Sequence, residues 1–184
     1  MREYVLEIKK LIPQNICDQI ISYVDHSEVD ALVSGSDKPI KEIRNCTTRS
    51  LLYPQTLGNK LITNYLKSAV FTVAEKYQKK FKDFSFKEIS QMDILKYEAN
   101  EFDAGYKFHV DFGHGFNKRS LSISICLNND YEGGEFVFDF FADQGLQIPQ
   151  NVGDAIAFPS NFMFPHQVNK ITLGTRYAII AWVY

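Results

Sequence analysis

The chain of 184 residues has few cysteines and histidines. Cys17, Cys46 and Cys126 are odd in number, widely spaced and without a C-x-x-C pair. This pattern excludes a disulfide framework and indicates reduced thiols in a cytosolic protein. The four histidines are His26, His109, His114 and His166, so any histidine-based site has a small set of candidates.

The sequence also lacks the features that mark a membrane protein or a nucleic-acid-binding protein. The N-terminal stretch Met1–Glu7 contains no apolar signal region, and no apolar run approaches membrane-spanning length. We therefore expect a soluble, cytoplasmic protein without a membrane partner. The net charge of −2 and the pI near 6.1 argue against a nucleic-acid partner, although they leave a local basic patch open.

Aromatic residues, in contrast, are plentiful. The chain contains 15 phenylalanines and 10 tyrosines, which favour a core built from β-strands over a helical bundle. A length of 184 residues is most simply one domain. We expect residues 1–87 to supply supporting helices and strands, and residues 88–184 to form the core.

Two helices are predicted in the first half of the chain. A short strand at 4–8 precedes a helix that opens at Pro13 and is capped by Asn15. An extended segment follows at 43–53. The second helix, at 56–81, has apolar residues at helical spacing: Leu57, Leu61, Ile62, Tyr65, Leu66, Ala69, Val73 and Tyr77.

From Glu88 onward, short apolar runs alternate with turn signals. The predicted strands are 89–97, 107–111, 121–127, 134–138, 147–148, 154–158, 166–168 and 176–183. Glycine pairs such as Gly133-Gly134 and the Gly153-Asp154 step mark turns between strands. Several short strands behind two helices indicate a mainly β, α+β fold of the sandwich or jelly-roll type, with the helices on one face of the sheet.

The stretch Tyr106–Phe112 contains the motif His109-Val110-Asp111. In an extended segment, side chains at i and i+2 leave the same face. An imidazole and a carboxylate are two of the three ligands in the facial triad of non-haem Fe(II) sites. Alone, this motif is a weak signal.

His166 is the candidate for the third ligand, and Arg176 follows it ten residues later. The same three groups can bind zinc, but zinc would give no reason for an arginine at the head of the apolar strand 177–183. An inward guanidinium there is costly unless it is paired, and a dicarboxylate would pair it bidentately. The alternative for Arg176 is an outward-facing charge at the end of a strand.

The two remaining histidines have simpler interpretations. We predict that His26 is a solvated residue near a helix end. His114 lies between Gly113 and Gly115, which suggests a mobile lid in which His114 is not a ligand.

Taken together, these motifs resemble the Fe(II)- and 2-oxoglutarate-dependent oxygenases, in particular their prolyl 4-hydroxylase-like branch. The resemblance covers residues 88–184 well and the first half only in general layout. Its motifs are Tyr97, Tyr106–Asp111, Ile125–Asn128, Tyr131–Phe136, Val152–Pro159, His166, Gly174–Arg176 and Trp182.

The resemblance implies a double-stranded β-helix with His109, Asp111 and His166 as iron ligands. It implies that Arg176 binds the distal carboxylate of 2-oxoglutarate, with Tyr97 as a hydrogen-bonding helper. The implied cofactors are Fe(II), 2-oxoglutarate and O₂, with ascorbate as a further expectation. Many prolyl 4-hydroxylases carry lysine where this chain has Arg176; arginine is shared with oxygen-sensing prolyl hydroxylases and PKHD-type relatives, which affects the subgroup and not the chemistry.

Three residues resemble positions that line the substrate groove of prolyl hydroxylases. Tyr106 and Trp182 would wall a proline ring, and Arg119 would anchor a peptide carbonyl. The alternatives are core aromatics and a loop charge.

The resemblance therefore implies hydroxylation of a prolyl residue in a peptide or protein, with succinate and CO₂ as co-products. Asp111 favours hydroxylation, because related halogenases lack the carboxylate ligand. The alternatives are hydroxylation of a free amino acid or another residue, and a catalytically silent metal-binding jelly roll. Repair of alkylated nucleic acid is disfavoured by the acidic balance and by the lack of a second strand arginine.

Overall fold

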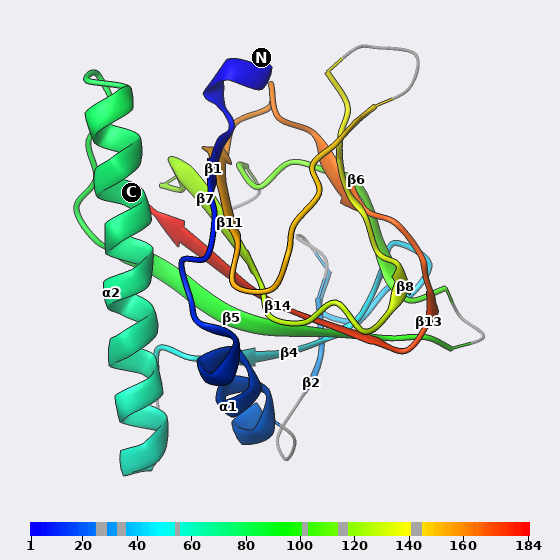
Figure 1. The fold of residues 1–184 in the computed structure, drawn as a ribbon. Coiled ribbons are helices and arrows are strands. Elements are labelled where there is room, and N and C mark those ends of the chain that lie inside the picture. The colour runs from blue at the N-terminus through cyan, green and yellow to red at the C-terminus, as the bar shows by residue number, and fades with distance from the viewer. Residues whose placement is uncertain (25–28, 33–35, 54–55, 101–102, 114–117, 141–144) are drawn as a thin grey trace.

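The computed structural model describes residues 1–24, 29–32, 36–53, 56–100, 103–113, 118–140 and 145–184. His26 and His114 lie outside these ranges, so both assignments stay predictions. In the described part, two β-sheets face each other and a long helix stands against the outside of one of them (Figure 1). No helix of the described residues is long and apolar enough to cross a membrane.

The larger sheet is antiparallel, and two long strands form its centre. Strand β14 (Thr175–Val183) pairs with β5 (Ile89–Glu98) on one side and with β7 (Leu121–Cys126) on the other. The sheet runs in the order β1 (Leu6–Ile8), β11 (Ala155–Pro159), β7, β14, β5, β4 (Thr47–Ser50) and β2 (Val29–Asp30).

The smaller sheet carries two of the predicted ligands. It runs in the order β10 (Leu146–Gln147), β9 (Phe136–Phe138), β12 (His166–Val168), β6 (Gly105–His109) and β3 (Arg44–Asn45). A separate pair joins β13 (Ile171–Leu173) to β8 (Glu132–Gly133). Strands from the first half of the chain thus join both sheets, and the mainly β, α+β double-stranded β-helix is confirmed.

A 3₁₀ helix (Arg2–Tyr4), α1 (Gln14–Val24) and α2 (Leu57–Lys80) complete the fold. Helix α2 lies where the periodicity predicts it, and the Thr56 side chain caps it by accepting the backbone N–H of Asn59 at 3.2 Å. The predicted Asn15 cap is wrong. Helix α1 begins at Gln14, and the carbonyl of Pro13 accepts the N–H of Cys17, so Asn15 lies inside the first turn.

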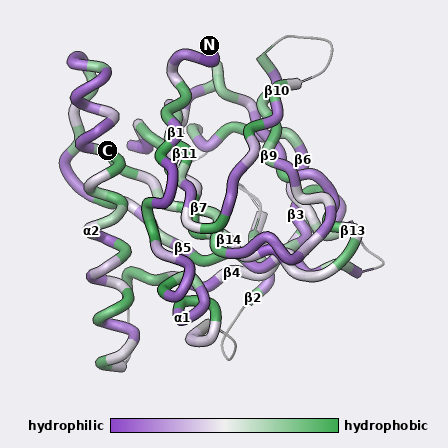
Figure 2. Tube along the Cα trace, viewed as in Figure 1, coloured by the Kyte–Doolittle hydropathy of each residue, from purple (hydrophilic) through white to green (hydrophobic). Residues whose placement is uncertain are grey.

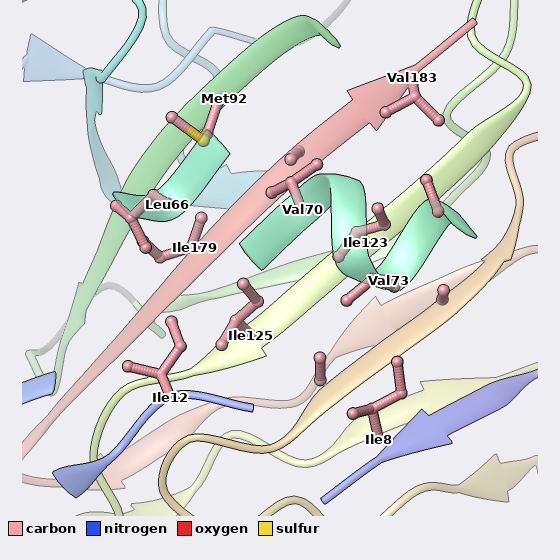
Figure 3. Close-up of a cluster of buried hydrophobic side chains, with 14 of the residues drawn as sticks. Ile8, Ile12, Leu66, Val70, Val73, Met92, Ile123, Ile125, Ile179 and Val183 are labelled. Carbon is pink, nitrogen blue, oxygen red and sulfur yellow. The ribbon is translucent and has the colours of Figure 1, made fainter. Parts of the chain in front are cut away.

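The central strands are buried on both faces. Alternate side chains of β7 and β14, such as Ile123 and Ile179, point toward α2, where Leu66, Val70 and Val73 cover them (Figure 3). The other side chains of β14, such as Ile180 and Trp182, face the space between the sheets, where they join the cluster that contains the aromatic residues of β9. This period of two is what a strand covered on both faces requires.

Only part of the predicted apolar face of α2 is buried. Leu66, Ala69, Val73 and Tyr77 pack on the sheet, whereas Leu57, Leu61 and Tyr65 are exposed. Along its length α2 alternates between hydrophobic and hydrophilic positions (Figure 2). Apolar spacing identified the helix correctly but did not show which turns the sheet covers.

Several strand limits differ from those predicted. Strand β6 ends at His109, so Asp111 lies beyond it, and β13 was not predicted at all. The expected positive φ is confirmed at Gly133, Gly134 and Gly153, and Gly153 lies in a turn as predicted. Gly133 instead ends strand β8, so the turn predicted at Glu132–Glu135 is wrong at its first two residues. At Gly153 a Cβ would lie 1.9 Å from the carbonyl oxygen of Ile12, so a side chain has no room there.

Two matched substitutions on α2 test this packing. Leu66 is fully buried and Leu61 is 65% exposed. Leu66→Ala should lower the free energy of unfolding by about 2–5 kcal/mol, because it leaves a cavity under α2. Leu61→Ala should change it by less than about 0.5 kcal/mol. Urea unfolding of both variants measures the difference, and equal losses would contradict the placement of α2.

Candidate metal centre and cofactor site

Three predicted ligands converge where β6 and β12 lie side by side. His109, the last residue of β6, is the register partner of His166, the first residue of β12. Asp111 lies two residues beyond the end of β6, and its carboxylate lies close to both histidines. One ligand atom from each residue falls within 4.8 Å of the other two. The fold therefore brings the three residues together as predicted.

Backbone carbonyls orient both imidazoles. Nδ1 of His109 lies 2.9 Å from the carbonyl of Lys107, and Nδ1 of His166 lies 3.0 Å from the carbonyl of Phe164. A carbonyl oxygen only accepts, so each Nδ1 carries the hydrogen. Each Nε2 is left with a free lone pair, the arrangement found in metal-ligating histidines.

Asp111 lies between the two free nitrogens. Its carboxylate oxygens are 3.7 Å from Nε2 of His109 and 3.7 Å from Nε2 of His166. The hydroxyl of Ser122 donates to Oδ2 at 2.6 Å, and a 2.8 Å hydrogen bond links Ser122 to Ser160. Both serines are buried, so they fix the carboxylate from behind.

Electrostatics favour an anionic Asp111 carboxylate and a neutral His109 imidazole. Burial raises the pKa of Asp111, but His166 and His109 beside it outweigh burial and hold that pKa below its ordinary value. Burial, assisted by His166, lowers the pKa of His109 to about 3. Two neutral imidazoles and one carboxylate are the donor set of mononuclear Fe(II) sites, so the residues fit the ion.

Aromatic rings enclose the ligands. The ring of Phe136 stacks on His166 with centroids 5.1 Å apart, and Tyr106 stacks on His109 at 3.5 Å. Tyr106 and His109 are three residues apart, a spacing that would put them on opposite faces of a regular strand. A bulge between β6 and β12 shifts the register and turns both side chains inward.

A cavity of about 630 Å³ opens beside the three ligands, between the two sheets. Arg176 lines it from the start of β14 and is 2% exposed, and its Nε has no hydrogen-bond partner. A buried guanidinium with one unpaired donor, on a residue that lines a cavity, fits a bound carboxylate. The outward-facing alternative for Arg176 does not match this position.

Tyr97 is the register partner of Arg176 and lines the same cavity. The guanidinium carbon lies 5.4 Å from the centroid of its ring. Burial raises the pKa of Tyr97 well above its usual range, so the phenol stays protonated and able to donate. The structure therefore places Tyr97 where a hydrogen-bonding helper of Arg176 would lie.

The three predicted substrate residues also line the cavity. The guanidinium of Arg119 covers the indole of Trp182 at 3.6 Å and donates to the carbonyl of Asp111 at 3.3 Å. Burial lowers the pKa of Arg119 to about 10, which leaves it cationic at neutral pH. Besides His109, the ring of Tyr106 contacts Arg44, whose guanidinium carbon is 4.8 Å from the ring centroid.

Sequence reasoning missed several polar residues of this cavity. Gln91 accepts from Arg119 and donates to Asp93, and Arg44 reaches the cavity from β3. Period-two alternation along β5 would have placed Gln91 and Asp93 on the face of Tyr97. Nothing in the sequence joined Arg44 or Ser122 to the site, because both depend on pairings between distant strands.

Comparison with known proteins agrees with this geometry. The family model of the 2OG-Fe(II) oxygenase superfamily matches residues 92–184, which include all three candidate ligands and Arg176. The chain belongs to this superfamily. Fe(II), 2-oxoglutarate and O₂ are the cofactors of the family, and the His109, Asp111 and His166 cluster fits the iron of this oxygenase.

Curated relatives of the oxygenase are PKHD-type hydroxylases. One from Psychrobacter sp. (strain PRwf-1) is 36% identical over 97 aligned positions, and the match covers 47% of this chain and 36% of the relative. Another, from Idiomarina loihiensis, is 31% identical over 101 aligned positions, and the match covers 53% of this chain and 43% of the relative. These matches span less than half the length of either relative.

Solved structures share the fold at low identity. A prolyl hydroxylase from Trichoplax adhaerens, in complex with a hypoxia inducible factor peptide fragment, superposes with a TM-score of 0.83 at 16% identity, covering 99% of this chain and 84% of that one. A Pseudomonas putida prolyl-4-hydroxylase gives 0.74 at 16% identity, covering 98% and 91%.

Ser122 gives a sharp test of the metal centre, because it touches a ligand and not the metal position. Ser122→Ala should weaken Mn(II) or Fe(II) binding by roughly 10–100-fold, since Asp111 loses its supporting donor. Ser124→Ala, two residues along the same face of β7, is the matched control and should leave metal affinity unchanged. Anaerobic calorimetry measures both; equal affinities in the two variants would refute the supporting role of Ser122.

Arg176 can be tested through 2-oxoglutarate itself. Arg176→Met should raise the Kd of 2-oxoglutarate by roughly 30-fold or more, because the distal carboxylate loses its charged partner. The metal affinity of Arg176→Met should stay unchanged. Arg49, whose guanidinium donates to the carbonyl of Tyr23, supplies the matched control: Arg49→Met should bind 2-oxoglutarate as the wild type does. Calorimetry with Mn(II)-loaded protein decides; an unaltered Kd in Arg176→Met would exclude Arg176 from the cofactor site.

Proposed function

We propose that this chain is an Fe(II)- and 2-oxoglutarate-dependent dioxygenase that hydroxylates a prolyl residue in a peptide or protein, with succinate and CO₂ as co-products. One observation carries the proposal. The three candidate ligands, Arg176 and an aromatic wall all line one cavity between the sheets. The printed names of the PKHD-type relatives and of the prolyl hydroxylase neighbours support the same reaction class.

His109, Asp111 and His166 would hold the iron on one face and leave its other positions open. Bound iron with 2-oxoglutarate and O₂ supplies the oxidising chemistry. Arg176 and Tyr97 orient the co-substrate by its distal carboxylate, and their burial keeps water away from that end. Phe136 and Phe158 pack against His166, so they also exclude water from the neighbourhood of the metal ligands.

Tyr106, Trp182 and Arg119 form the proposed substrate wall. Two flat rings suit a proline ring, and the Arg119 guanidinium above Trp182 suits a peptide carbonyl. Arg119 also bonds the backbone of the ligand Asp111, so a carbonyl that it anchors lies near the metal. We extend the proposal to a cytoplasmic location, since all three cysteines are buried free thiols.

The decisive experiment is succinate formation by protein loaded anaerobically with Fe(II) and 2-oxoglutarate and then exposed to air. A panel of proline-containing peptides should stimulate succinate and yield products heavier by one oxygen atom. His166→Ala should abolish both, because it removes a ligand. Turnover that no peptide stimulates would exclude the prolyl substrate and point to a free amino acid or another residue. Bound cofactors without any turnover would indicate a silent module.

A further inference from the structure

The cavity holds more unsatisfied polar groups than the proposed cofactors use. Among the described residues, the buried side-chain nitrogen and oxygen atoms without a hydrogen-bond partner belong to Arg44, Thr48, Asp93, Arg176 and Trp182. All five residues line the same cavity. Buried polar groups in native proteins are normally paired, so such a concentration marks a place where a ligand supplies the partners.

Two of the five belong to the site already described. Arg176 faces the proposed carboxylate of 2-oxoglutarate, and Trp182 lies beside Asp111, whose pKa its indole helps to lower. The other three are Arg44 from β3 of the smaller sheet, and Thr48 and Asp93 from the paired strands β4 and β5 of the larger sheet. Thr48 pairs with Leu95, so Thr48 and Asp93 are diagonal neighbours on one face, roughly 7–8 Å apart.

Asp93 is the most demanding of these three residues. It is 6% exposed; Oδ2 accepts from Gln91, and Oδ1 has no partner. Burial raises the pKa of Asp93, although Arg44 and Arg119 act on it in the opposite sense. Burial outweighs both guanidinium charges, and neither guanidinium bonds Oδ1. A carboxylate left in this state lacks a cation or a hydrogen-bond donor.

A groove of about 420 Å³ adjoins the cavity at the same place. Val29, Thr48, Gln91 and Asp93 line both hollows, and Leu52 and Tyr53 line only the groove. Thr48 and Asp93 thus lie where the groove meets the cavity of the metal centre.

Oδ1 of Asp93 accepts hydrogen bonds, so the group that it lacks is a hydrogen-bond donor. This group is not 2-oxoglutarate, because a buried aspartate would repel its carboxylates. An ammonium group provides three donors and a positive charge, enough for Oδ1 of Asp93 and the hydroxyl of Thr48 together. We propose that Asp93 and Thr48 bind a protonated amine of the substrate, either a lysyl side chain or a free α-amino group. This inference rests on the proposed function, because it places the amine in the cavity where the substrate reacts.

Blocked peptides of the form acetyl-X-Pro-Gly-amide and acetyl-Pro-X-amide test the proposal, with X as lysine, norleucine or glutamate. Unblocked Gly-Pro-Gly-amide tests the free amino group. Calorimetry on protein loaded with Mn(II) and 2-oxoglutarate gives each Kd. The lysyl peptides are compared with the norleucine peptides, and Gly-Pro-Gly-amide is compared with acetyl-Gly-Pro-Gly-amide. In at least one comparison, the peptide with the amine should bind at least about tenfold more tightly than its uncharged counterpart. The glutamate peptides should bind most weakly.

Asp93→Asn should reduce the preference for the amine to less than about twofold. The Kd of 2-oxoglutarate should stay unchanged in this variant, and an unchanged Kd also shows that the variant folds. Thr48→Val should reduce it partly. Asp83→Asn, the same change at an exposed position after α2, should keep the full preference.

Two results would overturn the inference: no amine preference in the wild type, or a preference that survives in Asp93→Asn. Hydroxylation of peptides without regard to the amine would reject the inference and keep the proposed function. Amine binding that depends on Asp93, without any hydroxylated product, would reject the proposed function and keep the binding site.

Discussion

The site depends on one buried carboxylate placed between two imidazoles. Asp111 is held from behind by Ser122, and each imidazole is oriented by its hydrogen bond to a backbone carbonyl. Three polar groups at such short distances are stable in an aromatic interior only when their lone pairs are used. A metal ion bound by all three groups would use these lone pairs. The identity of the three groups, their burial and their orientation therefore all indicate a metal site.

The two-sheet architecture turns this constraint into a reaction site. The smaller sheet supplies the histidines, and the larger sheet supplies Arg176, Tyr97 and Trp182 across the cavity. Because β14 is buried on both faces, packing of α2 on one face fixes the residues that the other face presents. The same strand, β14, therefore packs against α2 with one face and positions Arg176 with the other.

Much of this could be predicted from the sequence. The H-x-D motif, the distant His166 and Arg176 identified residues that the structure brings together, and apolar spacing located α2 to within a residue. Three features could not be predicted. The exposure of Leu61 depends on where the sheet ends under α2, the inward turn of Tyr106 depends on a bulge, and the entry of Arg44 into the cavity depends on the pairing of β3 with β6. Local patterns carry no information on any of them.

The central claim is that His109, Asp111 and His166 hold a metal beside a 2-oxoglutarate anchored on Arg176. A crystal structure of the protein soaked with Mn(II) and 2-oxoglutarate, with anomalous diffraction to locate the metal, tests it most directly. We predict one strong anomalous peak within bonding distance of both Nε2 atoms and the Asp111 carboxylate, and the distal carboxylate of 2-oxoglutarate paired with Arg176. A metal elsewhere, or a co-substrate carboxylate on Arg44 or Arg119 in place of Arg176, would contradict the account.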